Sequence, residues 1–125
     1  CPDAIGESSD IAALDTWRGG SPKDEDEGFN AAIVRTQKGL DLLNEAAKAG
    51  YIQIGDKLKI EDINDFQPHQ VKKKKAVYAR LKGLQKANLP TIKIERLRIE
   101  ELYKLNSKEF NQKEEAGIAS RFKKI

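Results

Sequence analysis

The sequence holds little of what catalytic or metal sites are usually built from. Its 125 residues include one Cys, one His, one Trp and no Met. Zinc and iron-sulfur sites need several Cys or His ligands, so the chain cannot form such a site by itself. Cys1 and His69 lie far apart along the chain, which disfavours a catalytic Cys–His pair. A single thiol also excludes an internal disulfide and suits a reducing, cytoplasmic location.

Long apolar runs are missing as well. No stretch approaches the roughly 20 apolar residues of a membrane span, and no apolar segment follows a basic N-terminus, so neither a span nor a signal peptide is predicted. Gly19 and Gly20 are followed by Ser and Pro, without the Lys and the helix start that a phosphate-binding loop needs. Because the chain begins at Cys1 rather than Met, we expect it to be part of a longer protein.

Charge is unevenly distributed along the chain. The net charge is +3, but residues 1–66 carry 14 acidic and 7 basic side chains, whereas residues 67–125 carry 6 acidic and 16 basic ones. A basic half is typical of proteins that bind nucleic acid or a phosphorylated ligand. Composition alone leaves both alternatives open.

Apolar patterning predicts strands and a helix in the first half. Short apolar runs predict a strand at residues 11–14 and a buried strand at 29–34. Apolar positions at helical spacing predict a helix over 37–49, with Thr36 as its N-cap and Gly50 in the left-handed conformation after its end. Residues 51–54 alternate and predict a further strand, so 29–54 would form a strand–helix–strand unit, with a right-handed crossover if the strands are parallel.

The second half is predicted to be mainly helical. An apolar stripe ends at Pro68, a longer amphipathic helix follows as far as Asn88, and residues 91–97 alternate like an edge strand. The remaining residues have helical spacing, with Ser107 as a cap between two helices. We therefore expect an α/β fold, with α+β as the alternative: a small mixed sheet covered by helices in a domain of residues 1–90, and a helical C-terminal extension in 91–125.

Two short clusters near the N-terminus suggest chemistry. In Cys1-Pro-Asp3, a Cys followed by Pro is typical of the last ligand of an iron-sulfur motif, and the alternative is a free thiol at a cut end. Asp15 and Trp17 follow a predicted strand, where pockets of open sheets lie, and offer a carboxylate and an aromatic face to a planar ligand. The alternative is a Trp that covers an edge of the core.

Two further clusters are cationic. Arg35 and Thr36 stand at a strand-to-helix junction, where a helix N-terminus favours an anion; the alternative is a cap beside a surface Arg. The run Lys72-Lys-Lys-Lys75 predicts either a phosphate clamp or a solvated face, and at least one of four consecutive helical lysines must face the protein. Nucleic-acid binding is the weaker alternative because only Tyr78 lies near the run.

The order of these clusters resembles the C-terminal part of the coenzyme F-420 hydrogenase/dehydrogenase beta-subunit family. That family has a Cys-x-x-Cys-x-Asp segment, an Ala-Asp-Ile strand, a Gly-Asp-x-Trp turn, and a strand ending in Arg-Thr before a Gly and a helix. The resemblance covers residues 1 to about 85, although Ser9 and Leu14 replace the usual Ala and Gly. The segments that carry it are Cys1-Pro-Asp3, Asp10-Ile-Ala, Asp15-Thr-Trp17, Gly28, Ile33-Val-Arg-Thr36, Gly39 and Leu42-Leu43.

The resemblance implies an iron-sulfur flavoprotein that passes electrons between FAD, 4Fe-4S clusters and a substrate such as coenzyme F-420. Cys1 would be one metal ligand, and the other cluster cysteines would lie in an upstream part of the same chain, with other redox subunits as further partners. This stretch alone should hold no cluster and should not turn over. A non-catalytic module that binds an acidic partner or nucleic acid through its basic half is the alternative. The cofactor-binding residues would be Asp15, Trp17, Arg35, Thr36, Lys73 and Lys74.

Overall fold

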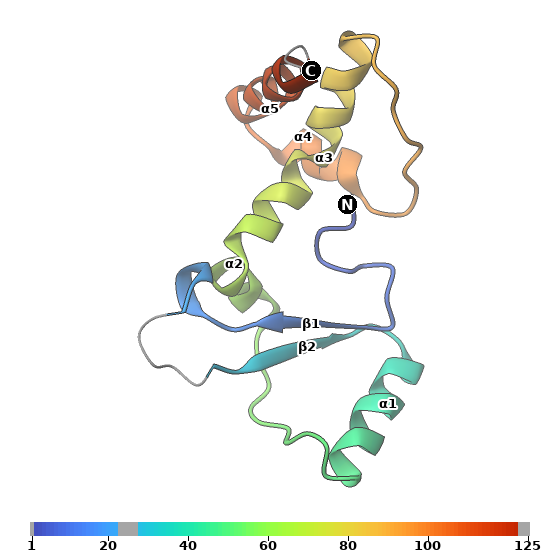
Figure 1. Cartoon of the computed structure of the whole chain (residues 1–125), viewed down its shortest axis with the longest axis vertical. Coiled ribbons are helices and arrows are strands. Elements are labelled where there is room, and N and C mark those ends of the chain that lie inside the picture. Colours follow the sequence, from blue (N-terminus) through green and yellow to red (C-terminus); the bar gives the residue numbers. More distant parts are fainter. Residues whose placement is uncertain (1, 23–27, 123–125) are drawn as a thin grey trace. The chain divides into compact units, whose positions relative to one another are not determined.

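The computed structural model describes residues 2–22 and 28–122 (Figure 1). The chain divides into an N-terminal unit, Asp3–Val71, and a C-terminal unit that starts at Lys72. Among the described residues, no helix has the length and apolarity needed to cross a membrane. The elements are β1 (Ile11–Asp15), η1 (Arg18–Gly20), β2 (Asn30–Val34), α1 (Gln37–Lys48), η2 (Ile60–Asp62), α2 (Ile63–Phe66), α3 (Pro68–Lys86), α4 (Ile99–Leu105) and α5 (Lys108–Phe122).

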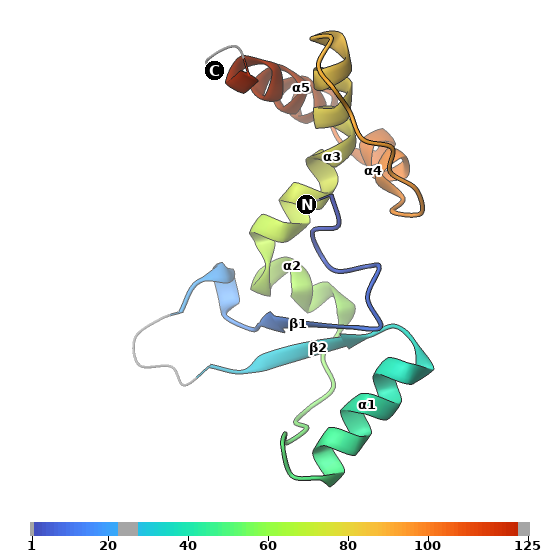
Figure 2. The ribbon, with the colours of Figure 1, turned by 45° about the vertical axis from the view of Figure 1, so that its right-hand side comes forward.

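The sheet of the N-terminal unit consists of β1 and β2. They pair antiparallel, with Ile11 opposite Val34 and Asp15 opposite Asn30 (Figure 2). The strands predicted at 11–14 and 29–34 are confirmed, although no residue of β2 is fully buried. The α/β class with a helical C-terminus is confirmed too, but the sheet is antiparallel rather than mixed. The strand predicted at 51–54 is wrong. These residues are exposed and have no ladder partner, so neither face of the segment is buried despite its alternating sequence.

Helix α1 begins and ends where local chemistry predicts. The Thr36 hydroxyl accepts a hydrogen bond from the Gly39 amide at 3.2 Å, which confirms the N-cap, and Gly50 has a φ of 78° after the helix. Gly39 also lies against β1, because a Cβ built there would come within 2.4 Å of the Asp10 carbonyl oxygen. The absence of a side chain at Gly39 therefore lets α1 start close to the strand.

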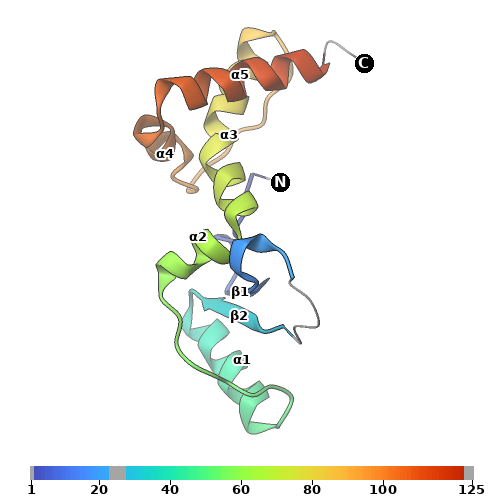
Figure 3. The same cartoon turned by 90° about the vertical axis from the view of Figure 1, so that its left-hand side faces the viewer.

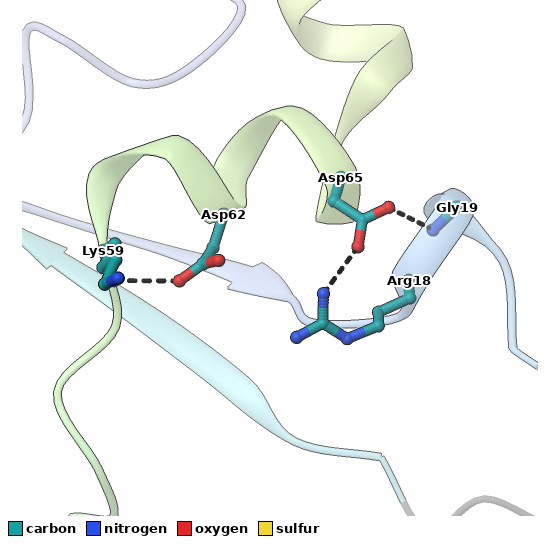
Figure 4. A network of polar contacts seen from close by, with 5 residues as sticks. All are labelled: Arg18, Gly19, Lys59, Asp62 and Asp65. Carbon is teal, nitrogen blue, oxygen red and sulfur yellow. Dashed lines mark hydrogen bonds and ion pairs between the residues drawn. The ribbon is translucent and has the colours of Figure 1, made fainter.

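A polar clamp joins the end of β1 to α2 (Figure 4). The Asp65 carboxylate accepts from the Arg18 guanidinium at 2.8 Å and from the Gly19 amide at 3.1 Å. Arg18 also lies over the ring of Phe66, which is 4% exposed. The clamp therefore holds the short helix α2 in place at the end of β1. Pro68 separates α2 from α3, as predicted.

The C-terminal unit is built from most of α3 with α4 and α5 (Figure 3). Its core contains Val77, Leu97 and Ile99. The Ser107 hydroxyl accepts from the Phe110 amide at 3.2 Å, so the predicted cap between two helices is confirmed. The edge strand predicted at 91–97 is wrong because this segment is irregular and Arg96 has a φ of 61°, which a strand does not allow.

Candidate functional site

Asp15 and Trp17 lie together at one end of the sheet. Asp15 is the last residue of β1, and its carbonyl accepts from the Gln67 side chain at 3.1 Å. The half-buried indole of Trp17 packs against Gly28, where a Cβ would lie 3.0 Å from the indole nitrogen. That nitrogen is buried and has no hydrogen-bond partner among the described residues. Trp17 thus covers an edge of the unit while keeping one unused donor.

Arg35 and Thr36 lie together at the other end. One terminal nitrogen of the Arg35 guanidinium donates to the Ile5 carbonyl at 2.8 Å, and the Arg35 amide donates to the Asp10 carbonyl at 2.9 Å. The other terminal nitrogen is buried and has no partner within the described chain. An unsatisfied buried donor is costly, and a bound acceptor would relieve that cost. Arg35 is therefore more than a solvated surface cation.

The start of α1 already carries a protein carboxylate. The Thr36 hydroxyl donates to Asp10 at 2.7 Å, and the Lys38 ammonium lies 3.6 Å from the same carboxylate. The hydrogen bond from Thr36, and then the Lys38 charge, lower the pKa of Asp10 below its usual value. Asp10 thus supplies the negative charge that a helix N-terminus favours, and Thr36 acts as the cap. A role of Thr36 in cofactor binding stays a prediction.

The two pairs of residues are separated by the length of the sheet. Asp15 pairs with Asn30 at one end of the ladder. Ile11 pairs with Val34 at the other end, and Arg35 follows Val34 in the chain. Five strand steps of about 3.3 Å place the two ends roughly 16 Å apart. The structure therefore brings Asp15 together with Trp17, and Arg35 together with Thr36, but it does not bring one pair to the other.

A groove of about 470 Å³ runs between these ends within the N-terminal unit. Of the predicted site residues that the structure describes, only Asp15 lines the groove. Arg35 does not line it, but its guanidinium donates to the carbonyl of Ile5, which does. Gln67 and Gln70 were missed because only the tertiary fold brings them to the sheet. The lining includes Ile5, Ala12, Leu14, Asp15, Ile33, Ile63, Gln67 and Gln70.

The predicted lysines belong to the C-terminal unit. Lys73 is exposed, whereas Lys74 is 5% exposed, so one lysine of the run is buried as expected. Cys1 lies outside the described residues. The described residues contain no group of three His, Cys, Asp or Glu side chains that could hold a metal ion. With one Cys, the chain also lacks the four thiolates that a 4Fe-4S cluster takes, whereas unused donors at Trp17 and Arg35 fit an organic, acceptor-rich ligand.

Comparison with known proteins gives one family. Searches of curated proteins and of solved structures returned no match. Residues 1–60 match the family model that describes the C terminus of the beta subunit in coenzyme F420 hydrogenase/dehydrogenase. These residues include β1, β2 and α1, hence both pairs of predicted site residues of the N-terminal unit. Over residues 1–60, the match supports the family of the C-terminal part of hydrogenase/dehydrogenase beta subunits, which the resemblance predicted.

Proposed function

We propose that this chain is part of a flavin- and iron-sulfur-dependent oxidoreductase that transfers electrons between FAD, 4Fe-4S clusters and a substrate such as coenzyme F-420. The observation that carries the proposal is the match of residues 1–60 to the beta-subunit family. A bound flavin would supply the redox chemistry, and the protein would supply binding, orientation and electrostatics. This division of labour agrees with a chain that has one His and one Cys.

Arg35 is the residue with the clearest proposed role. Its guanidinium is held by the Ile5 carbonyl, so its unused terminal N–H is fixed in position before any ligand binds. Guanidinium groups form strong, charge-assisted hydrogen bonds to phosphate oxygens. We therefore assign Arg35 to a phosphate of the cofactor, with Thr36 holding the start of α1 beside it.

The groove and its far end would take the apolar part of the ligand. Leu14, Ile33 and Ile63 supply apolar surface, and the Gln67 amide supplies a polar edge. Asp15 lines the groove, and Trp17, whose indole N–H has no partner within the described chain, follows it two residues later. A planar ring system with polar edges suits such a lining.

The remaining assignments rest on the family. Cys1 would be one ligand of a cluster whose other cysteines lie upstream in the same protein, and other redox subunits would exchange electrons with it. Lys73, which is exposed, and Lys74 belong to the C-terminal unit, and their role in cofactor binding stays a prediction. A cytoplasmic location is part of the same proposal.

FAD binding to the full-length protein tests this function. We expect the purified protein to show flavin absorbance and Arg35→Ala to weaken FAD binding about tenfold, as for the loss of one charge-assisted hydrogen bond. Trp17→Ala should weaken it about fivefold, as for the loss of one neutral hydrogen bond. Arg35→Lys keeps the charge but loses the guanidinium geometry and should recover only part of the affinity. Arg121→Gln, an exposed position in α5, is the control. A full-length protein that binds no flavin, or variants with unchanged affinity, would contradict the proposal.

A binding module is a second candidate, favoured by the exposed lysines of α3. Lys72, Lys73 and Lys75 are all exposed in the basic half of the chain. If this surface binds nucleic acid or an acidic partner, affinity for a single-stranded oligonucleotide should fall steeply with salt, and replacing these lysines by Gln should flatten that dependence. Salt-independent or undetectable binding in fluorescence anisotropy would exclude it.

A further inference from the structure

The C-terminal unit contains a pocket that the proposed function does not use. Its volume is about 410 Å³, within the range of small-molecule sites, and its walls come from α3, the segment 91–98 and the start of α4. The pocket lies outside the residues matched by the family model. Its apolar lining is continuous with the core of the unit and consists of Tyr78, Leu81, Ile92, Ile94, Leu97 and Ile99.

The polar lining of the pocket has an excess of positive charge. Both of its carboxylates are already engaged in ion pairs: Glu101 with Arg98 at 2.6 Å, and Glu100 with Lys104 at 3.3 Å. Two cations of the lining remain, Lys82 and Arg96. Within the described chain, neither of these two has a carboxylate at ion-pair distance. The charge that the pocket leaves uncompensated is therefore positive.

Lys82 is held at the wall of the pocket by Tyr103. Its ammonium lies 4.7 Å from the centre of the Tyr103 ring and donates to the Tyr103 hydroxyl at 3.4 Å. That hydroxyl donates in turn to Glu115 at 2.9 Å, and Glu115 forms its ion pair with Lys86. The hydrogen bond to Tyr103 raises the pKa of Lys82, so the side chain stays charged at any physiological pH. The hydroxyl of Tyr103 thus stands between Lys82 and the Glu115 carboxylate, which also pairs with Lys86.

Arg96 stands on a segment whose backbone is strained. Arg96 and Arg98 have φ values of 61° and 50°, in the left-handed region that non-glycine residues rarely adopt. Leu97 between them is 8% exposed and belongs to the core, so its burial holds both neighbours in place. Strained residues held by well-packed neighbours occur preferentially at ligand-binding segments.

We propose that this pocket binds a small molecule that combines a planar or tetrahedral oxyanion, carboxylate or phosphate, with an apolar body. The anion would lie between Lys82 and the guanidinium of Arg96, whose fork of donors suits either group. The apolar body would cover Leu81, Ile92 and Ile94. This site is independent of flavin binding, which the proposed function assigns to the N-terminal unit.

Titration of the 125-residue chain with simple probes tests the proposal. Phenyl phosphate and benzoate carry the two anions on one apolar ring, and phenol is the neutral comparator. In amide NMR spectra of the labelled protein we expect saturable shifts confined to residues 78–104, with either anion or with both. Arg96→Gln and Lys82→Gln should each weaken binding about tenfold. Arg121→Gln and Lys113→Gln, at exposed positions of α5, are matched controls and should bind like the wild type.

Each result decides for or against the site. Binding of phenyl phosphate alone supports a phosphate ester, binding of benzoate alone supports a carboxylate, and binding of both supports the shared oxyanion. Phenol that binds as tightly as the anions, shifts outside the pocket, no saturable shift at millimolar concentration, or folded Arg96→Gln protein with unchanged affinity would overturn the proposal. Arg96 is exposed, so its variant remains a valid test even if Lys82→Gln disturbs the packing of Tyr103.

Discussion

Replacing Gly83 by Ala should destabilise the C-terminal unit, because α3 and α5 approach each other closely there. A Cβ at Gly83 would lie 2.3 Å from the Glu115 carbonyl oxygen and 2.5 Å from a methyl carbon of Ile118. Since the nearer atom belongs to the backbone, no side-chain rotation relieves the clash, and α5 must move by about 1 Å. Overpacking of this kind costs about 1–3 kcal/mol, and the higher helix propensity of Ala returns about 1 kcal/mol.

We expect a net loss of up to about 2 kcal/mol in the free energy of unfolding, or a fall of up to about 8 °C in Tm for a chain of this size. Circular dichroism at the helical bands during urea and thermal unfolding measures both quantities. Gly117→Ala is a matched control in α5, because a Cβ there meets no atom within 4 Å. It should gain about 0.5–1 kcal/mol from helix propensity alone. If Gly83→Ala proved as stabilising as Gly117→Ala, the close crossing of α3 and α5 would be refuted.

Three further predictions concern the caps, the buried carboxylate and the proposed cofactor. Thr36→Ala should cost about 1 kcal/mol of stability and raise the pKa of Asp10 toward 3.8, as measured by NMR titration, whereas Thr36→Ser should retain both. The Lys86 and Tyr103 hydrogen bonds lower the pKa of Glu115 below 4.5, so the stability that this carboxylate contributes is present above pH 4.5 and is lost as the pH falls below it. Glu115→Gln should therefore cost about 1–2 kcal/mol at pH 7 and flatten the acid limb of the urea midpoint against pH. In FAD titrations, the effects of Trp17→Ala and Arg35→Ala should add to within about 0.5 kcal/mol in the double variant, because distant sites are independent; strong coupling would contradict their separation.

Features that depend on a few neighbouring residues could be predicted from the sequence. The Thr36 cap, the left-handed Gly50 and the break at Pro68 each arise from the chemistry of one short segment, and the structure contains all three. The first two strands were also recognisable from their short apolar runs, although their side chains are only half-buried or exposed. Local signals thus located most element boundaries in the first half of the chain.

Features that depend on distant partners could not be predicted. Residues 51–54 alternate like a strand, but alternation does not say whether a partner strand exists, and none pairs with them in the described chain. The segment around Arg96 alternates too, yet Arg96 and Arg98, on either side of the buried Leu97, are left-handed and interrupt a strand. Gln67 and Gln70 reach the groove only because α2 turns the chain back over the sheet.

The distance between the two halves of the candidate site restricts the ligand that the proposed function can involve. Asp15 and Trp17 are separated from Arg35 and Thr36 by the whole β1–β2 ladder, roughly 16 Å at the strand rise. A compact anion or a single ring system cannot reach both ends, so only an elongated molecule with a recognisable group at each end can use both sets of unused donors. A dinucleotide that carries a planar ring and a central pyrophosphate has that length and that distribution of acceptors. Under the proposed function, the separation of the two residue pairs therefore favours a flavin nucleotide, whose ribityl chain sets a planar ring apart from its phosphate, over a free ring or a free phosphate as the ligand of the N-terminal unit.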